Sequence, residues 1–395
     1  MELDEQRRAL IVQIEQLRAE QNRISKEIGS AKADIAPGLR QDLIDQISGV
    51  SAKLKGLEPE LARAEEELAA VSARLPNLPD DSAPDGESDA DNAEIKKVGE
   101  LPRFDFEVRD HVLLGEMLGM IDIERGVRTS GARFYYLTGA AVRLEFALVQ
   151  YALELADRFG MTPVIPPVLV REEAMYDTGF LPTDAVNLYV TREDDLYLTG
   201  TSEVALAALH AGEILEPDSL PRRYMGFSTC FRREAGTYGK DTRGIFRVHQ
   251  FDKLEMFSFV MPDASQDEHE RLLAIEEEWV QSLGLAYRVV NVCTGELGAS
   301  AAKKYDIEAW LPGQGTYREI TSTSNTTDFQ ARRMACRVRL PDGNRPLHTL
   351  NATLCAMART IVALLENGQR GDGSVELPEV LGRFLPDTVL RPPSV

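Results

Sequence analysis

Arginine and glutamate side chains gather in one short segment, residues 227–255, in a pattern that could bind a ligand with several charged groups. Strand-forming residues on either side of a glycine-containing stretch predict an antiparallel hairpin. Side chains two apart on a strand share a face. One surface of this hairpin would therefore collect Arg232, Glu234, Arg247, Phe251 and Glu255. Because like charges on one face repel and ordered side chains lose entropy, we favour a binding pocket over a solvated hairpin held by salt bridges.

Two later segments carry polar groups of the same kinds. The first is Tyr-Arg-Glu-Ile-Thr-Ser at residues 317–322, and the second is Asn-Ala-Thr at residues 351–353, followed by a helix that contains Arg359. Together with the arginine hairpin, they resemble the three signature motifs of the class II aminoacyl-tRNA synthetases. By this resemblance, motif 1 is the apolar helix from Val142 to Phe159 and the strand that follows it.

Three phrases narrow the resemblance to the seryl-tRNA synthetases. They are Thr-Gly-Thr-Ser-Glu at 199–203, Val-His-Gln-Phe-Asp-Lys at 248–253 and Ser-Asn-Thr-Thr-Asp-Phe-Gln-Ala-Arg-Arg at 324–333. The resemblance covers nearly the whole chain. It implies an enzyme that activates L-serine with ATP, releases pyrophosphate and transfers serine to the 3′ end of tRNA(Ser), with tRNA(Sec) as a further candidate. It also implies a homodimer, because motif 1 builds an interface between two copies in this class.

The resemblance implies three catalytic arginines. Arg232 would span the serine carboxylate and the α-phosphate with its planar guanidinium, and Arg247 would hold the outer phosphates and the leaving pyrophosphate. Arg359 would stack on the adenine opposite Phe251. The phosphates need Mg²⁺, for which Glu319 and Ser322 match the positions of the family. The implied ATP-binding residues are Arg232, Arg233, Glu234, Arg247, Val248, Phe251, Glu319, Ile320, Thr321, Ser322 and Arg359.

Serine presents an ammonium, a carboxylate and a hydroxyl, which a small polar pocket can distinguish from alanine through unpaired buried groups. The resemblance implies that Thr353 and Glu255 contact the hydroxyl. The full set of implied serine-binding residues is Thr201, Ser202, Glu203, Arg232, Glu255, Asn351 and Thr353. No covalent intermediate is needed, since orientation and electrostatics can supply the catalysis.

These residues require a body that positions them, and the N-terminal part of the chain has a different character. Leucine or isoleucine recurs every seven residues at Leu3, Leu10, Leu17 and Ile24, and again at Ile47, Leu54, Leu61, Leu68 and Leu75. The stretch 29–38 reads as a turn. Heptads of this kind predict an antiparallel two-helix coiled coil over residues 1–75, which we interpret as a tRNA-binding arm. The alternative is two separate amphipathic helices packed on a core.

Residues 76–96 are rich in Pro, Asp, Ser and Gly, and Asp80–Glu94 carries seven acids and no base. Such a segment has nothing to bury, so we expect a flexible acidic linker. Residues 97–395 mix helical patterns with short β-branched and aromatic runs. They predict an α+β catalytic domain, an antiparallel sheet flanked by helices as in class II synthetases.

Composition sets the compartment we expect. The net charge is −20, the first residues are charged, and no apolar run is long enough to cross a bilayer. Four cysteines lie far apart without a Cys-x-x-Cys pair, which favours a reducing cytoplasm over a disulfide framework or a zinc site. The five histidines show no metal-ligand spacing. We expect each histidine to be structural or exposed.

Three rival functions remain open. A ligase that loads amino acids onto a carrier protein should lack the long arm, and a catalytically silent relative should have lost some of the charged site residues. The third rival is a second-copy seryl-tRNA synthetase that tolerates a seryl-adenylate mimic, because Ala352 stands where many relatives have glycine, next to Thr353.

Overall fold

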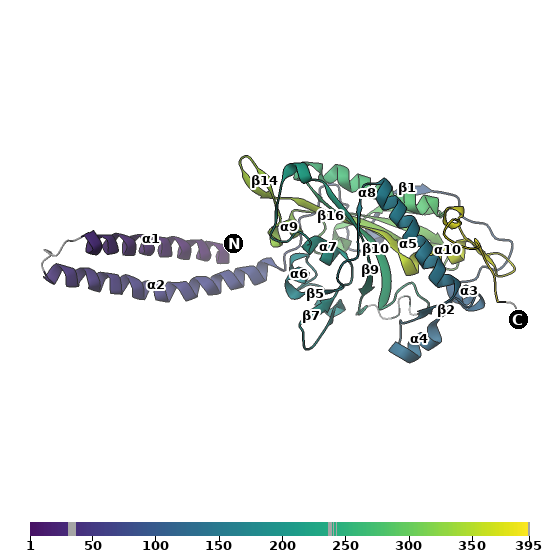
Figure 1. Cartoon of the computed structure of the whole chain (residues 1–395), viewed down its shortest axis with the longest axis horizontal. Helices are drawn as coiled ribbons and strands as arrows, with labels where there is room; N and C mark the ends of the chain where they lie inside the picture. The colour runs from purple at the N-terminus through teal and green to yellow at the C-terminus, as the bar shows by residue number, and fades with distance from the viewer. Residues whose placement is uncertain (31–36, 236–238, 240, 242, 394–395) are drawn as a thin grey trace. The chain divides into compact units, whose positions relative to one another are not determined.

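The computed structural model describes residues 1–30, 37–235, 239, 241 and 243–393. These residues form two compact units, Met1–Leu75 and Pro76–Val395, seen in Figure 1 as a pair of purple helices and a mixed α+β body. Within the described ranges, no helix combines the length and the apolar character that a membrane crossing requires.

The first unit is a pair of helices, α1 (Glu2–Ser30) and α2 (Pro37–Ser72), which pack side by side (Figure 1). The heptad positions form the seam, since Ile14, Ile24 and Leu54 are buried while the outer faces are exposed. Leu75 lies beyond the end of α2 and is exposed. The helical pair predicted by the heptads is confirmed, and the turn expected at 29–38 falls largely on residues 31–36, outside the described residues.

The acidic segment that follows is corrected by the structure, because we expected a flexible linker and it is bound to the body. The Asn77 side-chain amide donates to the carbonyl oxygens of Ser300 and Thr326, at 2.9 and 2.8 Å, and the Asp80 N–H donates to the Ala302 carbonyl. Strand β1 (Ala93–Val98) then joins the main sheet. The prediction considered only apolar burial, whereas hydrogen bonds to backbone groups hold this segment.

The body is built on an eight-stranded sheet in the order β1-β11-β12-β13-β16-β10-β9-β4. All neighbouring pairs are antiparallel except β4 with β9, which are parallel at one edge. The antiparallel sheet predicted for the body is therefore confirmed. Its remaining strands are β11 (Tyr287–Asn291), β12 (Lys303–Leu311), β13 (Thr316–Thr327), β16 (His348–Ala356), β10 (Gln250–Val260), β9 (Arg222–Phe231) and β4 (Thr162–Val164).

The central strands separate a core face from a polar face. On β10, Leu254 and Met256 belong to the large core formed with the long helices, whereas Phe251, Lys253 and Glu255 lie on the opposite face. The helices of the body are α3 (His111–Met117), α4 (Ile123–Ser130), α5 (Ala140–Arg158), α6 (Glu172–Asp177), α7 (Glu203–Ala208), α8 (Ser265–Ser282), α9 (Phe329–Arg333) and α10 (Met357–Asn367). Helices α5, α8 and α10 contribute most of the helical core, in which Trp279 stacks on Tyr151 with ring centroids 5.2 Å apart.

Small sheets surround the main one. They comprise β2 (Ile121–Asp122) with β3 (Tyr136–Leu137), β5 (Leu169–Arg171) with β7 (Leu196–Leu198) and β6 (Tyr189–Val190), β8 (Ile214–Leu215) with β14 (Arg337–Leu340) and β15 (Gly343–Pro346), and β17 (Val375–Glu376) with β18 (Val389–Leu390).

Candidate active site

The polar face of the main sheet opens into a cleft between the β9–β10 connection, β13 and the start of α10. The structure brings most of the predicted ATP-binding residues together there, and the lining includes Arg232, Glu234, Arg247, Val248, Phe251, Glu319, Ile320, Thr353 and Arg359. Strands β9 and β10 pair antiparallel, as the hairpin prediction requires, but pairing ends at Phe231 opposite Gln250. The expectation that Arg232, Glu234 and Arg247 occupy strand positions is therefore wrong, because all three lie in the connecting segment.

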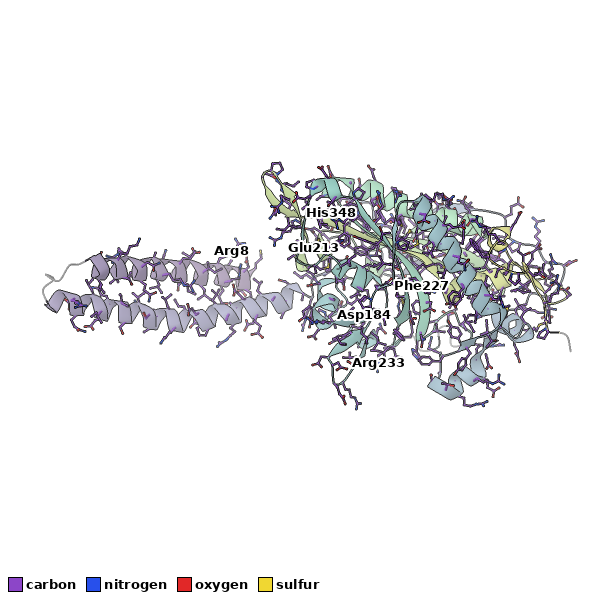
Figure 2. The ribbon with its side chains drawn as sticks, in the orientation of Figure 1. Arg8, Asp184, Glu213, Phe227, Arg233 and His348 are labelled. Carbon is purple, nitrogen blue, oxygen red and sulfur yellow. The ribbon has the colours of Figure 1, made fainter. Side chains whose placement is uncertain are left out.

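Arg232 leaves the end of β9 and joins two parts of the site. Its guanidinium lies 5.3 Å from the centroid of the Phe251 ring, and its Nε donates to the Gly200 carbonyl at 3.1 Å. Arg233 is a different case, because its guanidinium lies over the Tyr189 ring, 6.0 Å from the centroid, and it does not line the cleft. Figure 2 labels this side chain within the body. Neighbouring residues on an extended chain face opposite ways, so only one of the two arginines reaches the cleft.

Arg247 is held on the return side of the connection. Its guanidinium bonds the Glu234 carboxylate at 2.8 Å, and Asp241 lies 3.7 Å away. Glu234 has a φ of 50°, the left-handed region that side chains other than glycine rarely adopt. Asn187 braces this turn, since its carbonyl accepts from the Arg233 N–H and its side chain accepts from the Ala235 N–H. Strain of this kind is frequent at functional sites.

Arg359 enters the cleft from the first turn of α10. Its Nη1 donates to the Glu319 carbonyl at 3.0 Å and lies 3.3 Å from the Glu319 carboxylate. The guanidinium lies over the ring of Phe246, 4.9 Å from its centroid, while Arg232 covers Phe251. The two residues expected to sandwich the adenine thus line one cleft, but each is stacked on another partner in this structure.

Glu319 and Ser322 are the predicted metal ligands, on β13. The Glu319 side chain is partly exposed, and its partial desolvation acts to raise its pKa. The charges of Arg359 and Lys304 outweigh this effect and lower the pKa to about 2, so the carboxylate is ionised. Ser322 stands opposite Asp306 on β12. Ile320 lines the cleft, whereas neither Thr321 nor Ser322 does. Oxygen donors suit Mg²⁺, but the described residues hold no cluster of three or more His, Cys, Asp or Glu that would bind a metal alone.

The predicted serine-binding residues form a buried cluster beside the cleft. Lys253 forms an ion pair with Glu255, and its ammonium donates to the Thr201 hydroxyl at 2.7 Å. The Thr353 hydroxyl donates to the Glu255 carboxylate at 3.3 Å, across the β10–β16 pairing. Lys253 and Thr353 also line the cleft. They therefore connect the buried carboxylate to the nucleotide side of the site.

Glu203, at the start of α7, completes the cluster. Its carboxylate accepts from the side-chain amides of Asn351 at 3.0 Å and Gln330 at 2.8 Å. Burial, with the nearby Glu255 charge, raises the pKa of Glu203 to about 7. Ser202 is buried as well, and its hydroxyl has no hydrogen-bond partner among the described residues.

Sequence reasoning missed three residues that this geometry makes prominent. Lys253 belongs to the phrase at 248–253, which gives it no role. Its position two residues from both Phe251 and Glu255 nevertheless puts it on the same face of the strand. Gln330 belongs to the phrase at 324–333 that resembles the seryl-tRNA synthetases, but that phrase gives it no contact. Asn187 comes from a distant segment whose local sequence signals no role in the site.

Comparison with known proteins agrees with this geometry. Residues 187–368 match the tRNA synthetase class II core domain (G, H, P, S and T), and residues 1–79 match the seryl-tRNA synthetase N-terminal domain. The serine–tRNA ligase of Acidothermus cellulolyticus is 54% identical over 98% of this chain and 91% of its own length. The chain belongs to the seryl-tRNA synthetase family. Its activity is accordingly that of a serine–tRNA ligase.

Further relatives support the same assignment. The serine–tRNA ligase of Thermobifida fusca is 50% identical over 99% of this chain and 92% of its own. Among solved structures, seryl-tRNA synthetase from Pyrococcus horikoshii complexed with ATP is similar with a TM-score of 0.88 and 39% identity, over 100% of this chain and 92% of that one. The cytoplasmic serine–tRNA ligase of Naegleria fowleri, in complex with AMP, has a TM-score of 0.87 and 34% identity, covering 100% and 91%. The predicted fold class and enzyme class are confirmed.

Proposed function

We propose that the cleft joins the carboxylate of L-serine to the α-phosphate of ATP, and that the chain then transfers the seryl group to the 3′ end of tRNA(Ser). The position of Arg232 carries the proposal, because its guanidinium stacks on Phe251 in the cleft and bonds Gly200 beside the serine cluster. One planar group can thus contact both reacting anions. A bidentate guanidinium suits that task better than a point charge.

The reaction needs orientation and charge dispersal. The serine carboxylate attacks the α-phosphorus, the bond to the bridging oxygen breaks, and pyrophosphate leaves with the electron pair. Arg232 would balance charge between the carboxylate and the α-phosphate, and Arg247, held by Glu234, would neutralise the charge that collects on the leaving group. Arg359 would move from Phe246 onto the adenine, with Phe251 on the other face. Val248 and Ile320, two further residues of the expected nucleotide contacts, also line the cleft.

Mg²⁺ would be held by Glu319, which lines the cleft, and by Ser322, three residues further along β13. The donor set fits, since it consists of oxygen atoms and the Glu319 carboxylate is ionised. When bound, the ion supplies charge neutralisation of the phosphates. Without it, the same carboxylate neutralises Arg359.

Selection of serine would occur in the buried cluster. Glu203 and Glu255 offer carboxylates to the serine ammonium and hydroxyl, and Thr353 adds a hydroxyl that already bonds Glu255. Alanine would leave these buried groups unpaired, which costs on the order of several kcal/mol. Threonine carries an extra methyl group, which the proposed pocket would have to exclude.

The arm is proposed to bind tRNA. Residues 18–55 carry seven Lys or Arg against five acids, so the arm is only weakly basic, and its two long helices would contact the RNA backbone by shape. tRNA(Ser) is the proposed partner, and tRNA(Sec) is a further candidate.

We place the reaction in the cytoplasm, a proposal that the four buried free cysteines support.

A homodimer is the proposed assembly. Helix α5 exposes Val142, Phe146 and Leu153, which lie on one side of the helix because they are separated by four and seven residues. Exposed apolar side chains in a row suit an interface between two copies. Light scattering at micromolar concentration should give the mass of two chains, and Phe146→Glu should give the mass of one.

Exchange of labelled pyrophosphate into ATP tests the proposed reaction. Exchange should depend on serine and should be near background with threonine, alanine or glycine. A variant in which a short linker replaces residues 8–70 should keep the exchange and lose most tRNA aminoacylation, because adenylate formation needs only the body. Pyrophosphate exchange at the same rate with and without serine would overturn the proposed reaction. Unchanged aminoacylation without the arm would mean that tRNA is recognised elsewhere in the chain.

The other rivals gain no support from the structure. Ala352 lies in the core, on the face of β16 opposite Asn351 and Thr353, so its methyl group does not face the serine cluster. The silent relative should lack charged site residues, yet Arg232, Arg247 and Arg359 all line the cleft.

A further inference from the structure

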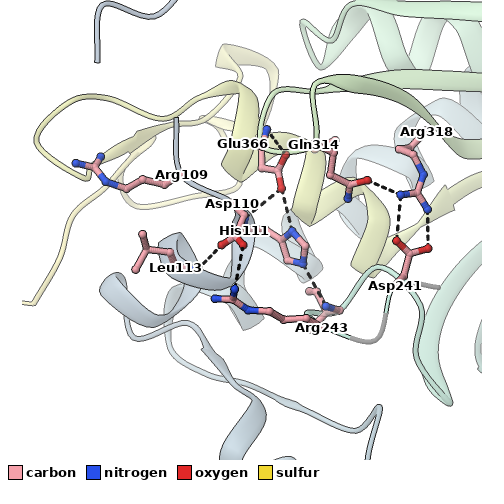
Figure 3. A network of polar contacts seen from close by, with 12 residues as sticks. Arg109, Asp110, His111, Leu113, Asp241, Arg243, Gln314, Arg318 and Glu366 are labelled. Carbon is pink, nitrogen blue, oxygen red and sulfur yellow. Dashed lines mark hydrogen bonds and ion pairs between the residues drawn. The ribbon is translucent and has the colours of Figure 1, made fainter. Parts of the chain in front are cut away.

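His111, which the sequence marked only as structural or exposed, is buried at the start of α3 and joins three distant segments. Its Nδ1 lies 2.9 Å from Oε1 of Glu366, and its Nε2 lies 3.3 Å from the backbone nitrogen of Ile245 (Figure 3). Glu366 is fully buried. These contacts run between α3, α10 and the end of the β9–β10 connection.

The hydrogen-bond geometry fixes the tautomer of His111. A backbone N–H can only donate, so the Nε2 that faces Ile245 must carry a lone pair. The proton of the neutral ring then lies on Nδ1, where it is donated to Glu366. The ring therefore acts as an acceptor toward the connection and as a donor toward α10.

The contact point lies next to an arginine of the site. Ile245 is two residues before Arg247, and Gly244 passes so close to the ring that a Cβ atom there would lie 2.1 Å from Nε2. Gly244 also has a φ of +88°. The chain can approach His111 in this way only because residue 244 has no side chain.

The other end of the network lies on the helix that carries Arg359. Glu366 follows Arg359 by two helical turns on α10 and therefore lies on the same side of the helix. Its two carboxylate oxygens accept from the N–H groups of His111 at 3.1 Å and Gly313 at 2.9 Å. The Gln369 side chain accepts from the Arg109 N–H and donates to its carbonyl, at 2.9 and 3.0 Å. With the bond from Nδ1 of His111 to Glu366 included, four hydrogen bonds fix residues 109–111 to Glu366 on α10 and to Gln369 just beyond its end.

We propose that His111 is a positioning residue for ATP. Glu366 orients the imidazole ring, and the ring holds the chain at Ile245, so that Arg247 faces the same cleft as Arg359. Asp241, bonded by Arg318 at 3.0 and 2.6 Å, fixes the same connection from β13 (Figure 3). The inference rests on the proposed function, since it assigns Arg247 to the phosphates of ATP. The serine cluster shares none of these contacts.

Two substitutions of His111 distinguish the contact made by Nδ1 from the contact made by Nε2. In His111→Asn, the amide nitrogen can still donate to Glu366, but no atom reaches Ile245. In His111→Gln, the amide oxygen lies near the place of Nε2 and can accept from Ile245. The readouts are the KM for ATP and the KM for serine in pyrophosphate exchange, with urea unfolding measured for both proteins.

His111→Asn should raise the KM for ATP roughly fivefold to tenfold, the scale of one buried hydrogen bond, and leave the KM for serine within about twofold. His111→Gln should restore the KM for ATP to near the wild-type value. Equal KM values for ATP in wild type and His111→Asn would overturn the proposal, as would a matching rise in the KM for serine. No serine-dependent exchange in the wild type would instead overturn the proposed function.

Gly244→Ala provides a test from the other side of the contact, for use also if His111→Asn does not fold. The added methyl group would collide with the ring and should reproduce the rise in the KM for ATP without changing that for serine. Its combination with His111→Asn should be no worse than the stronger single change, because both break one contact. Full additivity would contradict a shared mechanism.

Discussion

The serine side and the nucleotide side of the site are built in opposite ways. On the serine side, Lys253 is 5% exposed and Glu255 1% exposed, and both are paired with each other and with a threonine hydroxyl. On the nucleotide side, the Glu319 side chain on β13 is 41% exposed. The Arg247 side chain, on a connection outside the sheet, is 26% exposed. A small ligand that differs from its competitors by one hydroxyl needs a rigid, satisfied pocket. A large, highly charged ligand can bind to arginines that change partners as it arrives.

The largest expected effect is on stability and should occur only on the serine side. Lys253→Met removes the cation from a buried pair and leaves Glu255 without its charge partner, which should cost about 3–5 kcal/mol of unfolding free energy. Urea unfolding at pH 7 measures this. The double variant Lys253→Met/Glu255→Gln should recover part of the loss. A loss below about 1 kcal/mol would mean that the pair is more hydrated than its burial indicates.

Arg232 joins the two sides, so its loss should act on catalysis. Arg232→Ala should lower kcat/KM for pyrophosphate exchange by about 10² to 10³, or roughly 3–4 kcal/mol, the scale of one preorganised donor. Arg232→Lys should not rescue it, because a lysine cannot make two parallel contacts. The matched control is Arg233→Ala, whose side chain lies over Tyr189 away from the cleft. Near-normal exchange in Arg232→Lys would refute the bidentate role.

A smaller effect should follow pH on the serine side. Burial and Glu255 raise the pKa of Glu203 to about 7, so its carboxyl is mostly neutral at pH 6 and mostly ionised at pH 8. If the ammonium of serine requires the ionised form, the KM for serine should fall about tenfold from pH 6 to pH 8. The KM for ATP should stay level, and Glu203→Gln should flatten the serine profile. A profile of equal slope in Glu203→Gln would assign the titration to another group.

The raised pKa has a second consequence, for folding. A carboxyl whose pKa is higher in the folded chain than its ordinary 4.5 stabilises the fold when protonated, so the contribution of Glu203 is complete below about pH 4.5 and is lost as pH rises toward 7. Glu203→Gln should remove this pH dependence in urea unfolding.

The parts of the fold and of the candidate site that depend on a local sequence pattern could be predicted from the sequence. The heptads predict the arm because an apolar residue every seven positions has one stable solution, and alternation along a strand correctly put Phe251 and Glu255 on one face. The pattern predicts that Arg232 and Arg247 share a pocket, and the resemblance supplies their roles, but their convergence depends on a turn at Glu234 that strand alternation does not describe.

What escaped the sequence depends on contacts between distant residues. Residues 76–96 carry few large apolar side chains, and two of these, Leu78 and Ile95, are exposed. Asn77 and Asp80 nevertheless bond backbone groups more than two hundred residues away. The local sequence around His111 indicates no role, because its contacts with Glu366 and Ile245 form only in the folded chain. Backbone hydrogen bonds carry no sequence signature of their own.

The contrast between the two sides is tested most directly by comparing kcat/KM for serine and alanine in pyrophosphate exchange, in the wild type and in Thr353→Val. The wild type should prefer serine by about 10⁴ or more, since a site built for a hydroxyl rejects the analogue without one. Thr353→Val should lower the value for serine by about 10- to 100-fold while leaving alanine and the KM for ATP unchanged. An unchanged serine-to-alanine ratio, or equal losses for both amino acids, would contradict the account.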